Sequence, residues 1–334
     1  MIISQPLCAP ILIGTYNRIE HFKKLIASLK LCDLAKFTDI YIAIDYPCCD
    51  EVIIENQKIH DYSKKINGFL SVNIITRLEN FGPARNFFSA IDYIFLKHDR
   101  LILLEDDNIV AKNFLTYMNQ GLEFFEDDPK CLSLCGYNFT TEECKDLSPT
   151  NVYSAPYLCA WGLGYWRKKY VRCKNIVGNF PDPYFINPFN ILKTIRVAHY
   201  IFPMYISSIL SDKVFPDVEM SVHCIKHDCY NIYPTETKVI NMGFDGSGLN
   251  CGLNEGLVNK VMGNEAITNF KFRLIDEITL KHLHLNDDYH KNMVPIKFNG
   301  YLYAVFSFYL MSIIGRSRYI KLRNFVKKLL LNSN

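Results

Sequence analysis

The sequence predicts an α/β protein with a mostly parallel, Rossmann-like central sheet flanked by helices, followed by an irregular second half. Short apolar runs alternate with helical patterns over about the first 135 residues. One run, residues 101–104, is apolar at every position, as expected of a strand buried on both faces. Polar residues follow the ends of these runs. This alternation is typical of a doubly wound sheet, which binds ligands at the carboxyl ends of its strands.

The elements follow in order along the first part of the chain. The expected strands are short apolar runs bounded by polar residues, at 9–14, 40–44, 70–75, 101–104 and 131–135. The expected helices carry apolar residues three and four positions apart, at 22–29, 53–66, 83–96 and 113–125. The third helix has a proline in its first turn, where proline is well tolerated. After about residue 145 the alternation weakens.

The composition restricts the function classes. The 334 residues are 49% hydrophobic and 21% charged, with a formal net charge of +3, so a nucleic-acid-coating protein is not indicated. No phosphate-binding loop of the Walker A type and no G-x-G-x-x-G motif occurs, which argues against a hydride-transfer dinucleotide site. The twelve cysteines are scattered, and we interpret them as reduced thiols of a cytoplasmic protein.

Three consecutive acids, Glu105, Asp106 and Asp107, follow directly on the apolar run 101–104. Carboxylates held together at a strand end repel one another, and a divalent cation relieves that repulsion. Hard oxygen ligands suit Mg²⁺ or Mn²⁺, and the metal could in turn hold a diphosphate. The alternative is a helix N-terminus, with Asp107 or Asn108 capping the segment that follows.

Five segments carry a family resemblance in chain order. They are 9–21 (APILIGTYNRIEH), 77–86 (RLENFGPARN), 103–107 (LLEDD), 160–166 (AWGLGYW) and 241–248 (NMGFDGSG). Together they resemble GT-A glycosyltransferases of the family-2-like type found in bacteria. The acidic motif is also similar to that of the N-acetylglucosaminyltransferase I family. The late segment departs from the bacterial pattern, because Leu249 and Asn250 stand where Thr-His is frequent.

The resemblance implies a nucleotide-sugar site at the strand ends. Its nucleotide-sugar-binding residues would be Thr15, Asn17, Arg18, Asp45, Arg85 and Asp106. Asp107 would bind the metal, either Mn²⁺ or Mg²⁺. The chemistry of the residues agrees, because arginine makes bidentate phosphate contacts and carboxylates suit ribose hydroxyls. The alternatives are a surface turn at Asn17 and Arg18 and a solvated Arg85 on a helix.

The resemblance also implies acceptor-side residues. An inverting transfer needs a carboxylate that takes the proton of the acceptor hydroxyl. The family pattern maps this catalytic base onto Asp217, with Glu219 as its alternative, although the tryptophan of that pattern is missing here. The other interpretation is that Asp217 caps the helix that follows. Trp161 would stack on the acceptor sugar; the alternative is core packing, which we favour for Trp166. His282 or His284 could replace the histidine that the late segment lacks, but we favour a strand edge without a ligand role for both.

The resulting prediction is a metal-dependent inverting glycosyltransferase. It would move a hexose or N-acetylhexosamine from a UDP-sugar to a saccharide or lipid-linked saccharide, in bacterial surface polysaccharide or lipooligosaccharide assembly. Residues 1–145 would form the nucleotide-sugar-binding half and residues 146–295 the acceptor-binding half. The alternatives are a nucleotidyltransferase that makes the nucleotide-sugar and a non-catalytic membrane-associated scaffold. A nucleotidyltransferase would need a richer Gly, Arg and Lys loop than residues 14–18 provide.

The third expected segment, residues 296–334, is an aromatic and basic tail. Its apolar stretch 301–314 is too short to span a membrane, and the basic residues after it are not accompanied by any acid. We favour docking on the cytoplasmic face of an anionic inner membrane. The alternative is a buried C-terminal helix with a solvated basic end.

Overall fold

The computed structural model describes residues 8–139, 148, 150–174, 182–211, 213–246, 261–263, 265–274 and 296–332. Its contacts divide the chain into two compact units. The first comprises Met1–Ala155, Cys159–Val171 and Tyr230–Leu285, and the second Pro156–Leu158, Arg172–Cys229 and Asn286–Asn334. The units are interleaved in the sequence, whereas the expected halves and tail are consecutive segments. The functional assignment of those segments stays a prediction.

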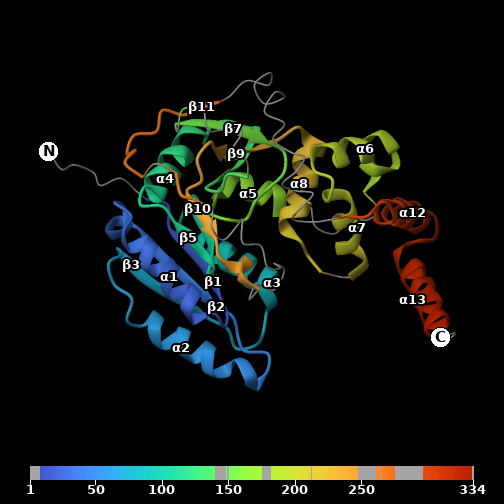
Figure 1. Ribbon diagram of the computed structural model, residues 1–334, viewed down its shortest axis with the longest axis horizontal. Helices are drawn as coiled ribbons and strands as arrows, with labels where there is room; N and C mark the ends of the chain where they lie inside the picture. Colours follow the sequence, from blue (N-terminus) through green and yellow to red (C-terminus); the bar gives the residue numbers. More distant parts are fainter. Residues whose placement is uncertain are drawn as a thin grey trace. The chain divides into compact units, whose positions relative to one another are not determined.

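The first unit is built on one nine-stranded sheet with the order β11-β7-β9-β6-β8-β4-β1-β2-β3 (Figure 1). Its strands are β1 (Ile11–Thr15), β2 (Asp39–Ile44), β3 (Ser71–Thr76), β4 (Arg100–Glu105), β6 (Cys131–Cys135), β7 (Asn151–Ala155), β8 (Leu163–Trp166), β9 (Tyr230–Pro234) and β11 (Arg273–Leu274). Only the pairings β4–β8, β6–β8 and β7–β9 are antiparallel. The sheet is therefore mostly parallel, as predicted. A second, two-stranded sheet pairs β5 (Asn108–Val110) with β10 (Val239–Asn241).

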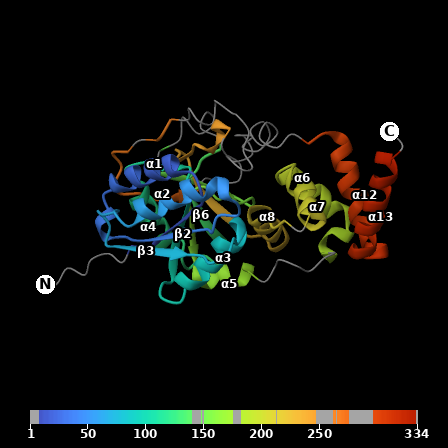
Figure 2. The same cartoon turned by 90° about the horizontal axis from the view of Figure 1, so that it is seen from below.

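Helices cover both faces of the large sheet. Ile11 and Ile13 of β1 belong to the same core as Phe22 and Leu25 of α1. The opposite face of β1 holds Gly14, where an added Cβ would lie 2.2 Å from the Phe87 ring of α3, so only glycine lets α3 pack this closely. Figure 2 shows α1 and α2 together on one side of the sheet. The chain thus winds in both directions from β1, which places the topological switch point between β1 and β4.

The helices of the first unit connect or follow its strands. They are α1 (Ile19–Lys30), η1 (Ala35–Phe37), η2 (Asp50–Val52), α2 (Ile53–Ser63), α3 (Gly82–Ile94), α4 (Phe114–Phe124), α5 (Arg167–Lys174) and η4 (Gly243–Asp245). The last residues of α5 belong to the second unit. The five expected strands and four expected helices are confirmed, with ends that differ by a few residues.

The second unit is helical in the part of the chain that the structure describes. It contains η3 (Pro183–Ile186), α6 (Pro188–Val197), α7 (Ile201–Ser211), α8 (Pro216–His227), α12 (Phe298–Ile314) and α13 (Arg316–Asn332). Asn187 begins α6 as an N-cap whose side chain accepts a 3.0 Å hydrogen bond from the Phe189 amide. Phe185, Phe202 and Phe308 are fully buried and pack their rings together. These aromatic contacts form the core of the unit.

Among the described residues, none of the helices combines the length and apolar composition that crossing a bilayer requires.

Candidate functional site

The carboxyl ends of β1 and β4 bring together one cation and two acids. The two strands pair in parallel with Gly14 opposite Glu105, so the residues that follow each strand meet at one edge of the sheet. The Arg18 guanidinium donates through Nη2 to Asp106 Oδ1, and its Nη1 lies 2.8 Å from Asp107 Oδ2. Thr15 Oγ1 donates to Asp106 Oδ2 at 2.9 Å. Thr15, Arg18, Asp106 and Asp107 therefore form one cluster at the switch point.

The cluster carries more negative than positive charge. The side chains of Asp106 and Asp107 are only 4% and 6% exposed, and a single guanidinium faces both of them. Burial raises the pKa of Asp106 and the charge of Asp107 acts in the same direction, while Arg18 and Thr15 oppose the shift. The two carboxylates in turn raise the pKa of Arg18 against the effect of its own burial. A further cation at this edge would therefore be stabilised.

The acids enter a turn and a short strand rather than a helix. Asn108 Oδ1 accepts a 3.1 Å hydrogen bond from the Glu105 amide, which closes the turn, and β5 begins at Asn108. The next helix, α4, begins only at Phe114, and its N-cap Asn113 makes no side-chain capping bond. The interpretation of Asp107 or Asn108 as a helix cap is therefore wrong. The pairing of β5 with β10 is the reason, because it uses the backbone that a helix would need.

That pairing also brings a distant amide beside the acids. Asn108 lies opposite Asn241, and the Met242 amide donates to the Asp107 carbonyl oxygen at 2.7 Å. A Cβ on Gly243 would lie 2.4 Å from Asp107 Oδ2 and 3.0 Å from Asn241 Oδ1. Asn241 Oδ1 accepts a 2.7 Å hydrogen bond from the Gly243 amide. The absence of a side chain at Gly243 therefore lets the Asp107 and Asn241 side-chain oxygens both approach the backbone at this position.

This donor set fits a hard divalent cation that takes the rest of its ligands from phosphate and water, as Mg²⁺ does. In such a site Asp107 would supply the carboxylate, and Asn241 Oδ1, which also accepts the Gly243 amide, would supply a neutral oxygen. Within the described residues, no group of three or more His, Cys, Asp or Glu side chains could hold a metal ion by itself. A cation bound here would therefore depend on the ligand for most of its coordination.

Asp45 lies at the carboxyl end of the neighbouring strand β2. It is buried, and its Oδ1 accepts hydrogen bonds from the amides of Tyr46 (2.9 Å) and Phe81 (2.8 Å). Asn56 Nδ2 ties the end of β2 to the end of β1 by donating to the Asp45 and Tyr16 carbonyl oxygens. Asp45 thus fixes the loop that carries Phe81. Asn17 is half-buried in the turn between β1 and α1.

Arg85, the sixth predicted donor-site residue, lies on an aromatic platform. Its guanidinium stacks over the Phe81 ring at 3.7 Å, and its Nη1 donates to Glu79 Oε1 at 2.9 Å. The Arg77 guanidinium also lies over Phe81, at 4.9 Å, and Arg77 is held by Asn86. The exposed Arg85 is therefore not joined to the acidic cluster by these contacts.

Trp161 lies in the first unit within a group of aromatic rings. It meets Tyr137 edge to face at 4.7 Å and Phe244 at 5.5 Å, and it is half-buried. Its role in acceptor binding stays a prediction. Trp166 is buried and donates from its indole nitrogen to the Leu122 carbonyl oxygen, which makes it a core residue.

The two candidate bases belong to the first turn of α8 in the second unit. The N-cap of α8 is Phe215, so the interpretation of Asp217 as the cap is wrong. Burial raises the pKa of Asp217 and also that of Glu219, to which the charge of Asp217 contributes. Ser208 donates to Glu219 Oε1 at 3.2 Å, while Glu219 Oε2 is buried without a hydrogen-bond partner among the described residues. Both residues are half-buried by accessible surface.

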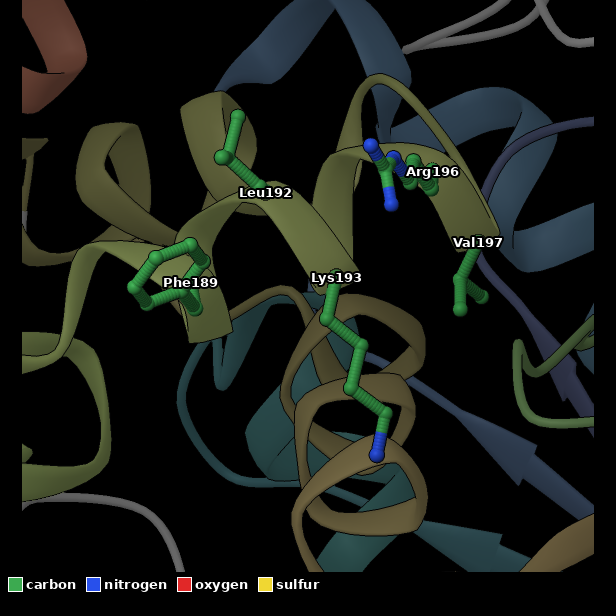
Figure 3. A pocket seen from close by; sticks show the side chains of 5 residues that line it. All are labelled: Phe189, Leu192, Lys193, Arg196 and Val197. Carbon is green, nitrogen blue, oxygen red and sulfur yellow. The ribbon is translucent and has the colours of Figure 1, made fainter.

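A surface depression of the second unit is lined entirely by α6. Its five residues are Phe189, Leu192, Lys193, Arg196 and Val197 (Figure 3). Lys193 points toward α8 and donates to the Ile225 carbonyl oxygen at 3.3 Å. The lining contains no carboxylate, so the depression offers no metal ligand and none of the predicted site residues.

No family model matches the sequence, and no curated protein matches it. Among solved structures, it is similar to the mannosyltransferase PcManGT from Pyrobaculum calidifontis in complex with GDP-Man and Mn²⁺, with 11% identity over 58% of this chain and 53% of that one (TM-score 0.36). It is also similar to residues 1–349 of S. aureus TarS in complex with UDP-GlcNAc, with 14% identity over 51% of this chain and 48% of that one (TM-score 0.36). Each similarity spans about half of the solved chain.

Sequence reasoning missed Asn241 and Gly243 as parts of the acidic cluster. The sequence did contain a signal for these two residues, because both belong to the late segment 241–248 of the family resemblance, of which residues 241–246 are described. It also missed the pair His21–Asp245, whose Nε2 and Oδ2 lie 3.1 Å apart and join α1 to the same late segment. His282 and His284 lie outside the described residues.

Proposed function

We propose that this chain is a metal-dependent glycosyltransferase of the GT-A type that takes its sugar from a nucleotide-sugar. One observation carries the proposal. Two buried carboxylates at the topological switch point share one arginine, and the side-chain oxygens of Asp107 and Asn241 both lie next to Gly243. A buried excess of negative charge is costly unless a cation offsets it, and this is the edge where doubly wound sheets bind ligands.

Each residue of the cluster has a part in donor binding. Asp107 and Asn241 would hold the cation, and a divalent cation bound there would supply positive charge to the diphosphate. Asp106, held by Thr15 and Arg18, presents a carboxylate to hydroxyl groups of the ribose or the sugar. Arg18 exchanges part of its contact with the acids for a phosphate oxygen, for which its planar fork is suited.

The base or ribose of the nucleotide would lie toward Asp45 and the Phe81 platform. Asp45 fixes the Phe81 amide, and the Arg77 and Arg85 guanidinium groups over the Phe81 ring provide positive charge beside the end of β2. UDP is the nucleotide we expect, carrying a hexose or an N-acetylhexosamine.

The transfer itself would proceed with inversion. The oxygen of an acceptor hydroxyl forms a bond to the anomeric carbon while the bond from that carbon to the diphosphate oxygen breaks. The nucleoside diphosphate leaves with the bonding electron pair, and the hydroxyl proton passes to the Asp217 carboxylate or, as its alternative, to Glu219. The raised pKa values of both groups support a base that holds this proton after transfer. The acceptor is a saccharide, stacked on Trp161 and lipid-linked in surface polysaccharide or lipooligosaccharide assembly.

A thermal-shift panel tests donor binding. UDP-, GDP-, dTDP- and CMP-sugars, including GDP-mannose and UDP-GlcNAc, are added with and without Mn²⁺. By mass action, a ligand at 100 times its Kd stabilises the fold by about 2.7 kcal/mol, so one nucleotide class should raise the melting temperature only with metal. Asp107→Asn should lose that metal-dependent rise, while the exposed control Asp61→Asn should keep it. A panel in which no nucleotide-sugar acts with metal would contradict the proposal.

A second measurement separates binding from chemistry. With an acceptor present, wild-type protein should release nucleoside diphosphate, and Asp217→Asn should retain the donor-dependent thermal shift while losing release by about a hundredfold or more, the usual scale of a general base. If Glu219→Gln has this effect and Asp217→Asn does not, the base is Glu219.

A further inference from the structure

The outward face of α12 is apolar and exposed. Phe298, Leu302, Phe306 and Ile313 are 72%, 54%, 62% and 79% exposed. Their spacing of four, four and seven residues places them on one side of the helix. The opposite side, with Ala304, Ser307, Phe308 and Met311, is buried. No charged residue occurs anywhere in α12. Contiguous exposed apolar faces of this kind mark interaction sites.

The neighbouring helix α13 adds positive charge to this surface. Its buried side is fixed to the end of α7, because Arg316 donates to the Ile209 carbonyl oxygen (2.7 Å from Nη2) and Arg323 to that of Leu210 at 3.3 Å. A hydrogen bond of 2.7 Å between the hydroxyl groups of Ser307 and Tyr319 joins α12 to α13. The two helices lie side by side (Figure 2).

The free face of α13 alternates cations with apolar groups. Arg318, Lys321 and Lys328 are exposed, as are Leu322 and Phe325. The sequence contains no Asp or Glu from residue 289 to its end. The charge of this surface is therefore entirely positive.

We propose that the outer faces of α12 and α13 form a docking surface for a bilayer that contains anionic lipids. Apolar side chains enter the interface while flanking cations meet the lipid headgroups, which is how amphipathic helices bind membranes without crossing them. Charge complementarity favours this partner over a second copy of the chain. A two-fold pairing of identical surfaces would bring two faces together that carry cations and no acid, and like charges repel.

This surface lies in the second unit and shares no residue with the donor cluster, so its test does not depend on the proposed enzyme activity. Vesicles of phosphatidylcholine alone and vesicles with one third phosphatidylglycerol are incubated with the full chain and separated by flotation. Wild-type protein should bind the anionic vesicles, and binding should weaken with salt.

Two sets of substitutions separate the apolar from the electrostatic contribution to vesicle binding. Leu302→Ser with Phe306→Ser should lower the bound-to-free ratio at least tenfold on anionic vesicles. Neutralising Arg318, Lys321 and Lys328 to Gln should lower it about fivefold for each cation, or roughly a hundredfold in total, on anionic vesicles alone. All five side chains are exposed, so the fold should be retained. Matched controls from the first unit are Leu31→Ser with Leu96→Ser, and Lys24, Lys36 and Lys65 to Gln.

Results that would overturn the docking proposal can be told apart from results that would overturn the proposed function. Failure of the wild type to bind anionic vesicles at low salt would overturn the proposal. So would a stable dimer in analytical ultracentrifugation that Leu302→Ser with Phe306→Ser dissociates, because a second copy would then cover the face. A donor-dependent thermal shift without vesicle binding would refute docking and leave the proposed function standing. Vesicle binding without any donor-dependent thermal shift would refute the proposed function and leave the docking proposal standing.

Discussion

Replacing Arg18 with Met should destabilise the first unit in a pH-dependent way. Arg18 is the single guanidinium that faces Asp106 and Asp107, whose side chains are only 4% and 6% exposed. Its removal leaves two adjacent buried carboxylates without that cation. Breaking a buried ion pair costs about 3–5 kcal/mol. Since the Arg18 side chain is itself 23% exposed, we reduce this range to about 2–4 kcal/mol near pH 8. For a domain of this size that lowers the melting midpoint by roughly 4–16 °C.

The sign of the pH dependence follows from the direction of the pKa shift. Burial already raises the pKa of Asp106, and loss of Arg18 removes the charge that opposes this shift. When a carboxyl group has a higher pKa in the folded state than in the unfolded state, its protonated form stabilises the folded state. This contribution to stability is lost as the pH rises through the pKa of the folded state. The destabilisation by Arg18→Met should therefore be largest near pH 8 and diminish toward pH 4.

Thermal unfolding of the wild type and three variants between pH 4 and pH 8 checks this reasoning. Adding Asp106→Asn to Arg18→Met should recover much of the lost stability at pH 8, because one of the two uncompensated charges is gone. Arg18→Lys should recover only part, since an ammonium cannot serve two carboxylates through a planar fork. An Arg18→Met penalty of equal size at pH 4 and pH 8, or no recovery by Asp106→Asn, would refute the electrostatic account and leave packing as the cause.

Three other substitutions are informative. Asp217→Asn should stabilise the protein slightly at pH 7, because burial raises the pKa of Asp217. The gain in stability should vanish below about pH 4, near the pKa of an aspartate in the unfolded chain. A destabilised variant in a pH series of unfolding curves would contradict this. Gly14→Ala should cost about 1–3 kcal/mol by overpacking against Phe87, and Phe87→Leu in the same chain should restore part of that loss in denaturant titrations. Gly243→Ala should displace the Asp107 carboxylate and abolish the Mn²⁺-dependent thermal shift; a retained shift would show that the cation binds elsewhere.

The first four strands were predictable because their sequence signal is local. Runs such as 101–104 are too short and too uniformly apolar for a surface helix, and the acids that follow them mark the site edge. The contact of Arg18 with these acids was not derivable from periodicity. It joins positions 88 residues apart and depends on the register of β1 with β4. The resemblance assigned Arg18 to the nucleotide-sugar pocket, and the structure adds its contact with both acids.

The later strands show why the rest of the sheet was missed. β8 lies between β4 and β6 and runs antiparallel to both, although it follows them in the sequence. Such an insertion is decided by long-range pairing, which leaves no periodicity in a four-residue strand. The stretch 185–210 likewise gave no clear pattern. It forms the helices α6 and α7. The apolar residues of α7 occur around most of its circumference, so its sequence shows no amphipathic stripe that would predict a helix.

The two features that packing explains least lie in different units. In the first, the excess negative charge at Asp106 and Asp107 lowers stability unless a cation is supplied. In the second, the exposed apolar face of α12 gains nothing from folding the chain alone. If each is retained for its own ligand, their variants should act independently. Asp107→Asn combined with Leu302→Ser and Phe306→Ser should lose metal-dependent donor binding and vesicle binding by the same factors as the separate variants, because substitutions at sites that share no partners have additive effects. A non-additive result would mean that donor and membrane binding are energetically coupled, so that the lipid surface regulates the enzyme as well as positioning it.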